Sequence, residues 1–533
     1  MKRKMSLSSM AGLIGIICLV FVFWVSPIES QAIGIEKSPV QFVKQVPESG
    51  MPTLNKSFAD GLSNSTISTH NPCDLSQQNA PSSTNPIYFN HLYSINSENS
   101  ASGGVIPITD GYFVLSGHGD SGGVTKFDQH GMPVFSKDFS YSYDVDLFDV
   151  TKTSDGKYLA GGFYINTYAE GILAKVDSDL TPLWVKTSNT LNYDTFIAAV
   201  ESTVDNGILA LARENRGFGI LKFDGSGNLL WKKRIYVAPD LFTDAFSIRE
   251  NYYYDASLNK HCGGIIIFGA VYHNANNPDL YLAAISCDGS TIHWQRIIGG
   301  SSWDGTYNDS GMMYERSSNM IMMEDHNSEN TQNAKYAVAA TTNSFGQNEA
   351  IMVIPFTITG TTTLSSTVSV GQIKLVDGSN QEIVHASGTR FMRLSDGNAL
   401  LVGKTDSSGA GSMDIYLIKM DTSFSPIWQY TYGTAGYELG YGISETTNGI
   451  QLAGLSQTAA VFSSLESNGT NQDLCLERNT ANLTVSNLSP TITTPTYTVD
   501  NGTLAISSDT LTLTDSDASI TCPRLVYLPL TLK

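Results

Sequence analysis

Residues 151–162 read T-K-T-S-D-G-K-Y-L-A-G-G, and residues 174–184 read A-K-V-D-S-D-L-T-P-L-W. The first stretch places an Asp-Gly turn before a small, apolar strand, and the second ends a strand at Lys-x-Asp ahead of an aromatic residue. Asp-Gly closes tight hairpins because glycine tolerates a positive φ. A strand that is apolar on both faces is typical of one buried on both sides. Together the two stretches predict an antiparallel sheet of four strands.

Both patterns recur along most of the chain. The turn-plus-strand pattern starts units near residues 105, 148, 197, 246, 312, 388 and 441. A unit of about 45 residues has the size of a propeller blade. The repeat therefore predicts an all-β fold, a β-propeller of about seven four-stranded antiparallel blades. The Lys-x-Asp pattern precedes an aromatic residue by seven positions at Asp128 and Phe135, Asp177 and Trp184, Asp224 and Trp231, and Asp421 and Trp428, and a degenerate copy without the lysine has Asp288 and Trp294.

The recurring aromatic position indicates a recurring packing need. We expect Trp184, Trp231, Trp294 and Trp428 to be structural and to fill the gaps between blades, because a buried indole contributes a large apolar area. The seventh unit lacks a fourth strand with an aromatic residue, and residues 86–95 have the character of that strand. We predict that this segment closes the ring, which removes exposed sheet edges.

The repeat resembles the secreted prokaryotic β-propeller repeats whose units read roughly T-S-D-G-G-Y-I-V-A-G and K-x-D-x-x-G-x-x-x-W. The resemblance covers about residues 86–470. It implies the propeller architecture and says little about activity, because most such proteins have no assigned function. The Lys-x-Asp…Trp part also resembles the tryptophan-docking repeat of quinoprotein dehydrogenases. The sequence contains no adjacent Cys-Cys pair, which weakens that second resemblance.

The segments outside the repeat differ in composition. Three basic residues at positions 2–4 precede an apolar run at 10–25, as in a signal peptide, and the alternative is an uncleaved membrane anchor. We expect a secreted or cell-surface protein with no transmembrane span after processing. The predicted divisions are residues 1–32 as signal peptide, 33–85 as polar linker, 86–474 as the propeller, and 475–533 as a Ser/Thr-rich C-terminal β segment, docked on the propeller or forming a stalk.

Five cysteines follow the signal peptide, and export permits disulfides. We predict a bond between Cys475 and Cys522, which bracket the C-terminal segment. A second bond is predicted between Cys262 and Cys287, which flank neighbouring strands of one blade. The odd number leaves the state of Cys73 open.

The net charge and the spacing of motifs argue against several classes of function. A net charge of −19 disfavours nucleic-acid binding, because an acidic surface repels phosphate backbones. The nine histidines lack the paired spacing of zinc hydrolases. The string Gly-Asp-Ser-Gly-Gly at 119–123 has no matching histidine motif for a catalytic triad. The sequence predicts no cofactor, no metal site and no catalytic residue.

The loops that join one blade to the next are predicted to gather on one face, around the channel. Aromatic rings there stack on sugars or peptide side chains, and carboxylates accept hydrogen bonds. The alternative is that the acids solvate loops and the aromatic residues plug the channel. Trp303 stands out because it lies outside the register of the four structural tryptophans. The candidate ligand-binding residues are Tyr143, Asp144, Asp146, Tyr193, Asp194, Asp244, Trp303, Asp304, Tyr307, Tyr437 and Glu438.

The function that these patterns favour is an extracellular or cell-surface binding or scaffold propeller. It would present one face to a polymer, glycan, peptide or surface protein. The alternative is a secreted carbohydrate-active enzyme, a glycan hydrolase or lyase, or a quinone-dependent dehydrogenase. The sequence makes no prediction of oligomeric state.

Processing at the predicted cleavage site gives a direct test. The exported protein should begin near Ile33, after the small residues Ser30 and Ala32. N-terminal sequencing of surface-associated or secreted material measures this. A sequence that begins at Met1 would show that the apolar segment is retained as an anchor.

Overall fold

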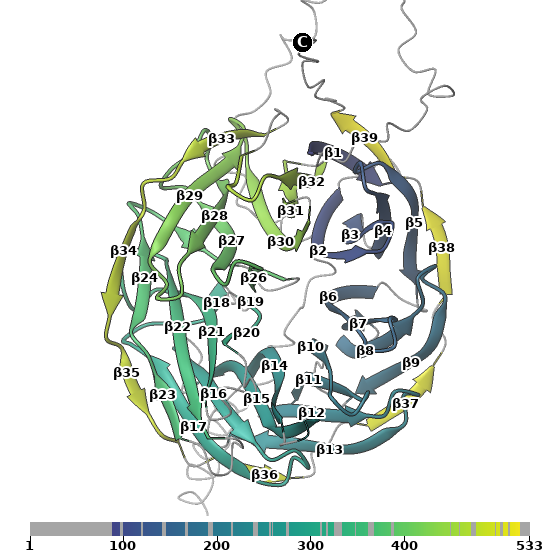
Figure 1. Ribbon diagram of the computed structural model, residues 1–533, viewed down its shortest axis with the longest axis vertical. Coiled ribbons are helices and arrows are strands. Elements are labelled where there is room, and N and C mark those ends of the chain that lie inside the picture. Colours follow the sequence, from purple (N-terminus) through teal and green to yellow (C-terminus); the bar gives the residue numbers. More distant parts are fainter. Residues whose placement is uncertain are drawn as a thin grey trace, which may run out of the picture.

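A computed structural model shows an all-β, seven-bladed propeller (Figure 1). The elements of the described part of the chain are all strands. The structure describes residues 88–95, 100–118, 121–140, 145–165, 169–189, 196–214, 217–237, 243–254, 257, 259–272, 277–309, 312–315, 318–324, 333–346, 348–360, 367–384, 389–447, 449–457, 459–470, 476–495, 497–500, 505–509, 512–516 and 518–522.

The first four blades each take four consecutive strands from the chain, ordered from the central channel outward. Blade 1 has β2 (Ser100–Ile108), β3 (Gly111–His118), β4 (Ser121–Asp128) and β5 (Pro133–Ser140). Blade 2 has β6 (Val145–Lys152), β7 (Tyr158–Ile165), β8 (Ala169–Val176) and β9 (Pro182–Asn189). Blade 3 has β10 (Phe196–Ser202), β11 (Ile208–Glu214), β12 (Gly217–Phe223) and β13 (Leu229–Tyr236). Blade 4 has β14 (Thr243–Tyr254), β15 (Lys260–Tyr272), β16 (Pro278–Ile285) and β17 (Ile292–Gly299).

Blades 5 and 6 carry additional short strands, and a hairpin of β18 (Thr306–Asp309) and β19 (Met312–Glu315) precedes blade 5. Blade 5 has β20 (Ile321–Glu324), β21 (Asn333–Thr342), β22 (Ala350–Thr359), β23 (Thr367–Val370) and β24 (Ile373–Asp377). Blade 6 has β25 (Glu382–Ile383), β26 (Phe391–Arg393), β27 (Ala399–Thr405), β28 (Asp414–Met420) and β29 (Pro426–Gly433).

Blade 7 joins the two ends of the ring. Its first three strands are β30 (Glu438–Thr446), β31 (Gly449–Ser456) and β32 (Ala459–Leu465), and its fourth is β1 (Phe89–Ile95). β1 pairs antiparallel with β32, so that Phe89 lies opposite Ser464 and Tyr93 opposite Ala460. The prediction that residues 86–95 close the ring is therefore confirmed for the described strand.

The C-terminal segment forms a belt of seven short strands around the propeller, drawn in yellow in Figure 1. Each belt strand pairs antiparallel with the outer strand of one blade, and the blades are visited in the order 6, 5, 4, 3, 2, 1, 7. The segment is thus docked and does not form a stalk over its described length. Its strands are β33 (Glu477–Thr480), β34 (Thr484–Leu488), β35 (Thr491–Thr493), β36 (Thr498–Asp500), β37 (Ala505–Asp509), β38 (Thr512–Ser516) and β39 (Ala518–Cys522).

Glutamine side chains of the outer strands help to hold the belt. In blade 4, the buried Tyr281 hydroxyl donates to Gln295 Oε1, and Gln295 Nε2 donates to the Tyr497 carbonyl of the belt. In blade 6, Tyr416 and Gln429 make the same pair of bonds toward the Leu483 carbonyl. The belt is therefore anchored by side chains from within the blades as well as by its ladder hydrogen bonds.

The repeated sequence pattern has a direct structural explanation. The lysine of Lys-x-Asp forms an ion pair with the aspartate of the preceding turn in four blades. The Asp of Lys-x-Asp caps its own turn; Asp177 Oδ1, for example, accepts the backbone N–H groups of Asp179 and Thr181. The four ion pairs are Lys126–Asp110, Lys175–Asp155, Lys222–Asp205 and Lys419–Asp396, at 2.6–2.9 Å.

The aromatic residue of each unit packs against the neighbouring blade. Trp231 of blade 3 covers Gly289 in the outer turn of blade 4, where φ is 68° and an added Cβ would lie 2.9 Å from the indole. Where the outer strand carries a smaller side chain, the turn carries a larger one, as with the buried Leu180 opposite Phe135. The same aromatic-on-glycine contact joins Trp184 to Gly227, Trp428 to Gly469 and Phe89 to Gly131.

These contacts support the structural role predicted for the four tryptophans. Trp294 is buried and lies 6.5 Å, centroid to centroid, from Phe356 of blade 5. The other three are half-buried at the joints between blades. At the joints of Trp184, Trp231 and Trp428, the large indole faces a turn that carries a glycine.

The predictions for the disulfides and for the segments outside the propeller can be compared with the structure only in part. The predicted Cys262–Cys287 disulfide is present. Cys475 lies outside the described residues, so its bond with Cys522 stays a prediction. The predicted signal peptide (1–32) and linker (33–85) also lie outside them. In the described portion no helix has the length and apolar character needed to cross a membrane.

The joint between blades 3 and 4 can be tested with a matched pair of glycines. Gly289 and Gly156 have similar positive φ values, 68° and 76°, but a Cβ at Gly156 would meet no atom within 4 Å. Gly156→Ala should therefore cost only the left-handed backbone penalty, about 1 kcal/mol. Gly289→Ala should cost about 1–3 kcal/mol more, because it also collides with the Trp231 ring. Urea unfolding measures both.

A double-mutant cycle isolates the contact. Trp231→Ala alone should cost about 3 kcal/mol of unfolding free energy. In the Trp231→Ala background, Gly289→Ala should lose the part of its additional penalty that comes from the ring and keep only the part imposed by the flexible Lys233 side chain, whose Cγ would lie 2.8 Å from the added Cβ. Equal losses for the two glycines in the wild-type background would contradict the packing described.

Candidate functional site

The two ends of the propeller differ in construction. Because the strands of each blade are antiparallel, the turns between strands 1 and 2 and between strands 3 and 4 share one end, here called the turn face. The loops between strands 2 and 3 and the links to the next blade share the other end, here called the loop face. The loop face is the one predicted to bind a ligand.

Only some of the predicted loop-face residues are described. Tyr143, Asp144, Tyr193 and Asp194 lie outside the described residues. Asp146 lies in β6 and Tyr307 in β18, where the structure describes the backbone. The remaining predicted residues are Asp244, Trp303, Asp304, Tyr437 and Glu438.

Asp304 and Glu438 fasten the links between blades. Each is fully buried at the entry to a blade and accepts a hydrogen bond from the backbone N–H four residues earlier, that of Gly300 or Thr434. Asp304 also accepts the Thr342 hydroxyl from the second strand of blade 5. Glu438 likewise accepts the Ser456 hydroxyl at 2.8 Å.

Glu382 repeats this arrangement in blade 6, and the sequence reasoning missed it. It accepts the Gly378 N–H at 2.7 Å and the Thr405 hydroxyl at 2.9 Å. The signal that points to it is a carboxylate four residues after the end of a blade, as in Gly378-Ser-Asn-Gln-Glu382. These three acids thus hold loops in place through buried hydrogen bonds, and for Asp304 and Glu438 this is neither the ligand contact predicted nor the loop solvation given as the alternative.

Asp244 is also a structural group. It is fully buried, accepts the Tyr272 hydroxyl at 2.8 Å and lies 3.6 Å from Arg213 Nη1. Tyr437 differs from these acids because its ring is half-buried, 5.8 Å from the Lys404 ammonium. It is the one predicted loop-face residue with a described side chain that still reaches solvent.

Trp303 was singled out as a candidate ligand-binding residue outside the register of the structural tryptophans, but its side chain is buried. Its side chain is 6% exposed, compared with 8% for the structural Trp294. The indole Nε1 lies 3.2 Å from the Asn343 side-chain amide, and the Trp303 carbonyl accepts the Asn343 N–H at 3.0 Å. The small Gly and Ser residues beside Trp303 gave no sign of this burial, because its packing partner Asn343 follows a strand about 40 residues later in the chain.

The turn face carries a hairpin that the repeat pattern did not predict. β14 and β15 continue four residue pairs past Glu250 and Ile265, ending with Tyr254 opposite Lys260. This extension carries three consecutive tyrosines, residues 252–254, followed across the strand by Lys260 and His261. The run of tyrosines was the available signal.

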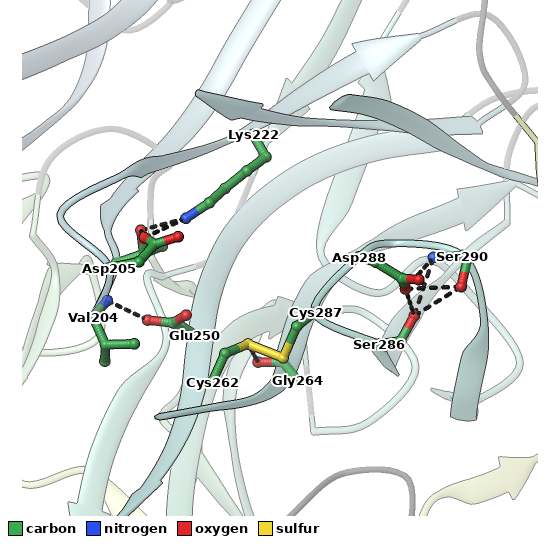
Figure 2. The surroundings of a disulfide bond; sticks show 11 residues. Val204, Asp205, Lys222, Glu250, Cys262, Gly264, Ser286, Cys287, Asp288 and Ser290 are labelled. Atoms are coloured by element: carbon green, nitrogen blue, oxygen red, sulfur yellow. Dashed lines mark hydrogen bonds and ion pairs between the residues drawn. A yellow bond between two sulfur atoms is a disulfide. The ribbon is translucent and has the colours of Figure 1, made fainter. Parts of the chain in front are cut away.

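Two anchors hold the hairpin. Cys262 is bonded to Cys287 in the outer turn of the same blade, and Figure 2 shows this bond beside the Asp288 turn. On its other strand, the fully buried Asn251 accepts the Tyr336 hydroxyl of blade 5 at 2.7 Å. The hairpin is thus fixed to its own blade and to the next one.

The tip of the hairpin combines aromatic rings with cations. The Lys260 ammonium lies 4.0 Å from the Tyr252 ring centroid and 5.6 Å from that of Tyr254. Tyr253 and His261 face each other with ring centroids 5.5 Å apart. Lys260 and His261 are exposed and the tyrosines are half-buried. This arrangement suits stacking and anion contacts better than proton transfer.

The described residues contain no group of three His, Cys, Asp or Glu side chains that could hold a metal ion. Glu250 and Asp149 instead connect the inner strands around the channel. Asp149 accepts the Val200 N–H at 2.9 Å, and Glu250 accepts the Val204 N–H at 2.6 Å, a bond drawn in Figure 2. These groups tie blade 2 to blade 3 and blade 4 to blade 3.

Comparison with known proteins adds no family. No family model matches the chain, and no curated protein matches it. Among solved structures, the chain is similar to the NanB sialidase from Streptococcus pneumoniae, as a single-residue mutant and in complex with a substituted ethanesulfonate. The identities are 13% and 12%, the TM-scores 0.30 and 0.29, and each match covers 76% of this chain and 72% of the other. A similarity of this size carries no argument about function.

Three carboxyl groups should make stability depend on pH. Burial raises the pKa of Asp304, Asp149 and Glu250 to about 7 each, against the backbone and hydroxyl donors that lower it. A carboxyl pKa that is raised in the folded state means that folding binds protons. Its stabilisation is complete below the unfolded pKa near 4 and is lost as the pH rises through about 7.

The unfolding free energy should therefore fall between about pH 4 and pH 7. In Asp304→Asn, the unfolding free energy should depend less steeply on pH than in the wild type. This comparison of slopes holds whether or not the substitution changes the absolute stability. Asp396→Asn is the control: the Lys419 hydrogen bond offsets burial and lowers the Asp396 pKa, so that group titrates below this range. Urea unfolding at several pH values measures the slopes, and an unchanged slope in Asp304→Asn would contradict the assignment.

Proposed function

We propose that this chain is an extracellular or cell-surface binding propeller that presents one face to a polymer, glycan or surface protein. The observation that carries the proposal is the anchored aromatic hairpin of blade 4 on the turn face. The resemblance to secreted propeller repeats and the predicted signal peptide agree with an exported protein. The Cys262–Cys287 bond is compatible with the same location.

The hairpin has the properties of a binding element. Rigid aromatic side chains provide contact area at a low cost in conformational entropy. Anchors on both strands, at Asn251 and Cys262, fix the hairpin before any ligand arrives, which reduces the cost of binding. Exposed Lys260 adds a cationic donor on a chain whose net charge is −19, and exposed His261 adds a second polar ring.

The enzyme alternatives have less support. A glycan hydrolase needs two carboxyl groups that reach the substrate. Three of the loop-face carboxylates whose side chains are described, Asp304, Glu382 and Glu438, are fully buried and occupied by backbone and hydroxyl donors. They are therefore suited to holding loops and not to proton transfer.

Two tyrosine variants distinguish the two faces. Purified mature protein is applied to glycan and peptide arrays, and Tyr253→Ala is compared with Tyr437→Ala. Both remove a half-buried ring, one from the turn face and one from the loop face. On the best array ligand, Tyr253→Ala should weaken binding about tenfold or more, and Tyr437→Ala should leave it within about twofold.

The opposite ranking would move the binding surface to the loop face. Turnover of an array ligand, followed by product analysis, would favour the carbohydrate-active enzyme instead. An absence of binding on both arrays would overturn the proposal for glycans and peptides.

A further inference from the structure

β1 is attached to its blade differently from the other outer strands. In blades 1 to 6 the outer strand follows the third strand along the chain. In blade 7 the outer strand β1 comes from the opposite end of the propeller sequence, with Tyr93 paired to Ala460. No turn connects β1 to β32, so only non-covalent contacts of the described residues hold it there.

These contacts close the joint between blades 7 and 1. Phe89 lies 5.0 Å, centroid to centroid, from Phe462 of blade 7, and Tyr93 lies 5.0 Å from Phe127 of blade 1. The buried His91 ring bonds to the Gly131 carbonyl of blade 1 at 3.0 Å. If β1 leaves, blade 7 loses its outer strand and the ring opens at this joint.

The last strand of the belt covers the outer edge of β1. In β39, Ile520 lies opposite Tyr93, and Ser519 lies opposite Ser94. β1 therefore has a ladder on both edges, toward β32 and toward β39 (Figure 1). Detachment of β1 requires both ladders to break.

The belt reaches β1 with its last described strand. The belt starts on blade 6, passes the other blades in reverse order and reaches β1 only with β39. Among the described belt strands β39 is the last in this order, and the end of a run of paired strands opens more readily than its middle. Loss of β39 alone exposes the edge of β1, whereas loss of a middle belt strand does not.

We infer that β39 is a latch on ring closure. The ring opens between blades 7 and 1, and it does so only after β39 has detached from β1. The latch is set last, once the remainder of the belt lies on the other six blades. This inference concerns how the ring opens and is independent of the proposed binding function.

Matched proline pairs in the full mature chain test the latch. S519P/I520P places prolines in β39, and T491P/I492P places them in β35 on blade 4. Proline removes ladder donors and blocks strand pairing. Amide hydrogen exchange, read by mass spectrometry, is compared for residues 89–95 of β1 and 292–299 of β17.

S519P/I520P should increase exchange in β1 by about 100-fold or more and leave β17 unchanged. T491P/I492P should increase exchange in β17 and leave β1 within about threefold of wild type. Unchanged exchange of β1 in S519P/I520P would overturn the latch. An equal rise of β1 exchange in both variants would also overturn it, because the belt would then stabilise the ring as a whole.

The wild-type protein provides a measurement that does not depend on whether the variants fold. In amide hydrogen exchange of the native protein, the amides of residues 518–522 should exchange before those of β1 or together with them. Exchange of β1 ahead of β39 would contradict the proposed order.

Discussion

The ring depends on the pairing of β1 with β32, because this pairing joins the last blade of the chain to the first. This pairing brings Phe89 onto Gly131, in the same aromatic-on-glycine contact that joins blades elsewhere. The closing strand therefore satisfies both the hydrogen bonds of blade 7 and the packing between blades 7 and 1. The C-terminal belt then gives the outer strand of each blade a second ladder of backbone hydrogen bonds.

In this closed ring, most described turns and links between blades are held by hydrogen bonds or ion pairs that stabilise the fold. The turn face is built mainly from repeated, ion-paired turns, and the described links of the loop face are fastened by buried Asp304, Glu382 and Glu438. Against this regular background, the hairpin of blade 4 projects with three tyrosines and is anchored on both strands. The ring holds this hairpin in a fixed position, and a ligand bound to the hairpin would not require the ring to change.

Much of the architecture could be predicted from the repeat, because each unit carries its own turn, apolar strand and aromatic residue. The closing strand and the Cys262–Cys287 bond also followed from the sequence. The path of the belt did not, because backbone ladders impose no side-chain pattern on a Ser/Thr-rich segment. Burial of Trp303 and the fastening role of Asp304 were missed for a related reason. Asn343 and Thr342 contact them from a strand about 40 residues later, and a single sequence shows no such pairing.

Cross-linking of residues 90 and 463 tests ring closure most directly. Asn90 of β1 lies opposite Ser463 of β32. In the variant N90C/S463C, mild oxidation followed by peptide mapping should recover one disulfide-linked peptide pair that contains these two positions. Recovery of both introduced cysteines as free thiols, or a disulfide that links position 90 to a different blade, would show that β1 does not close the ring.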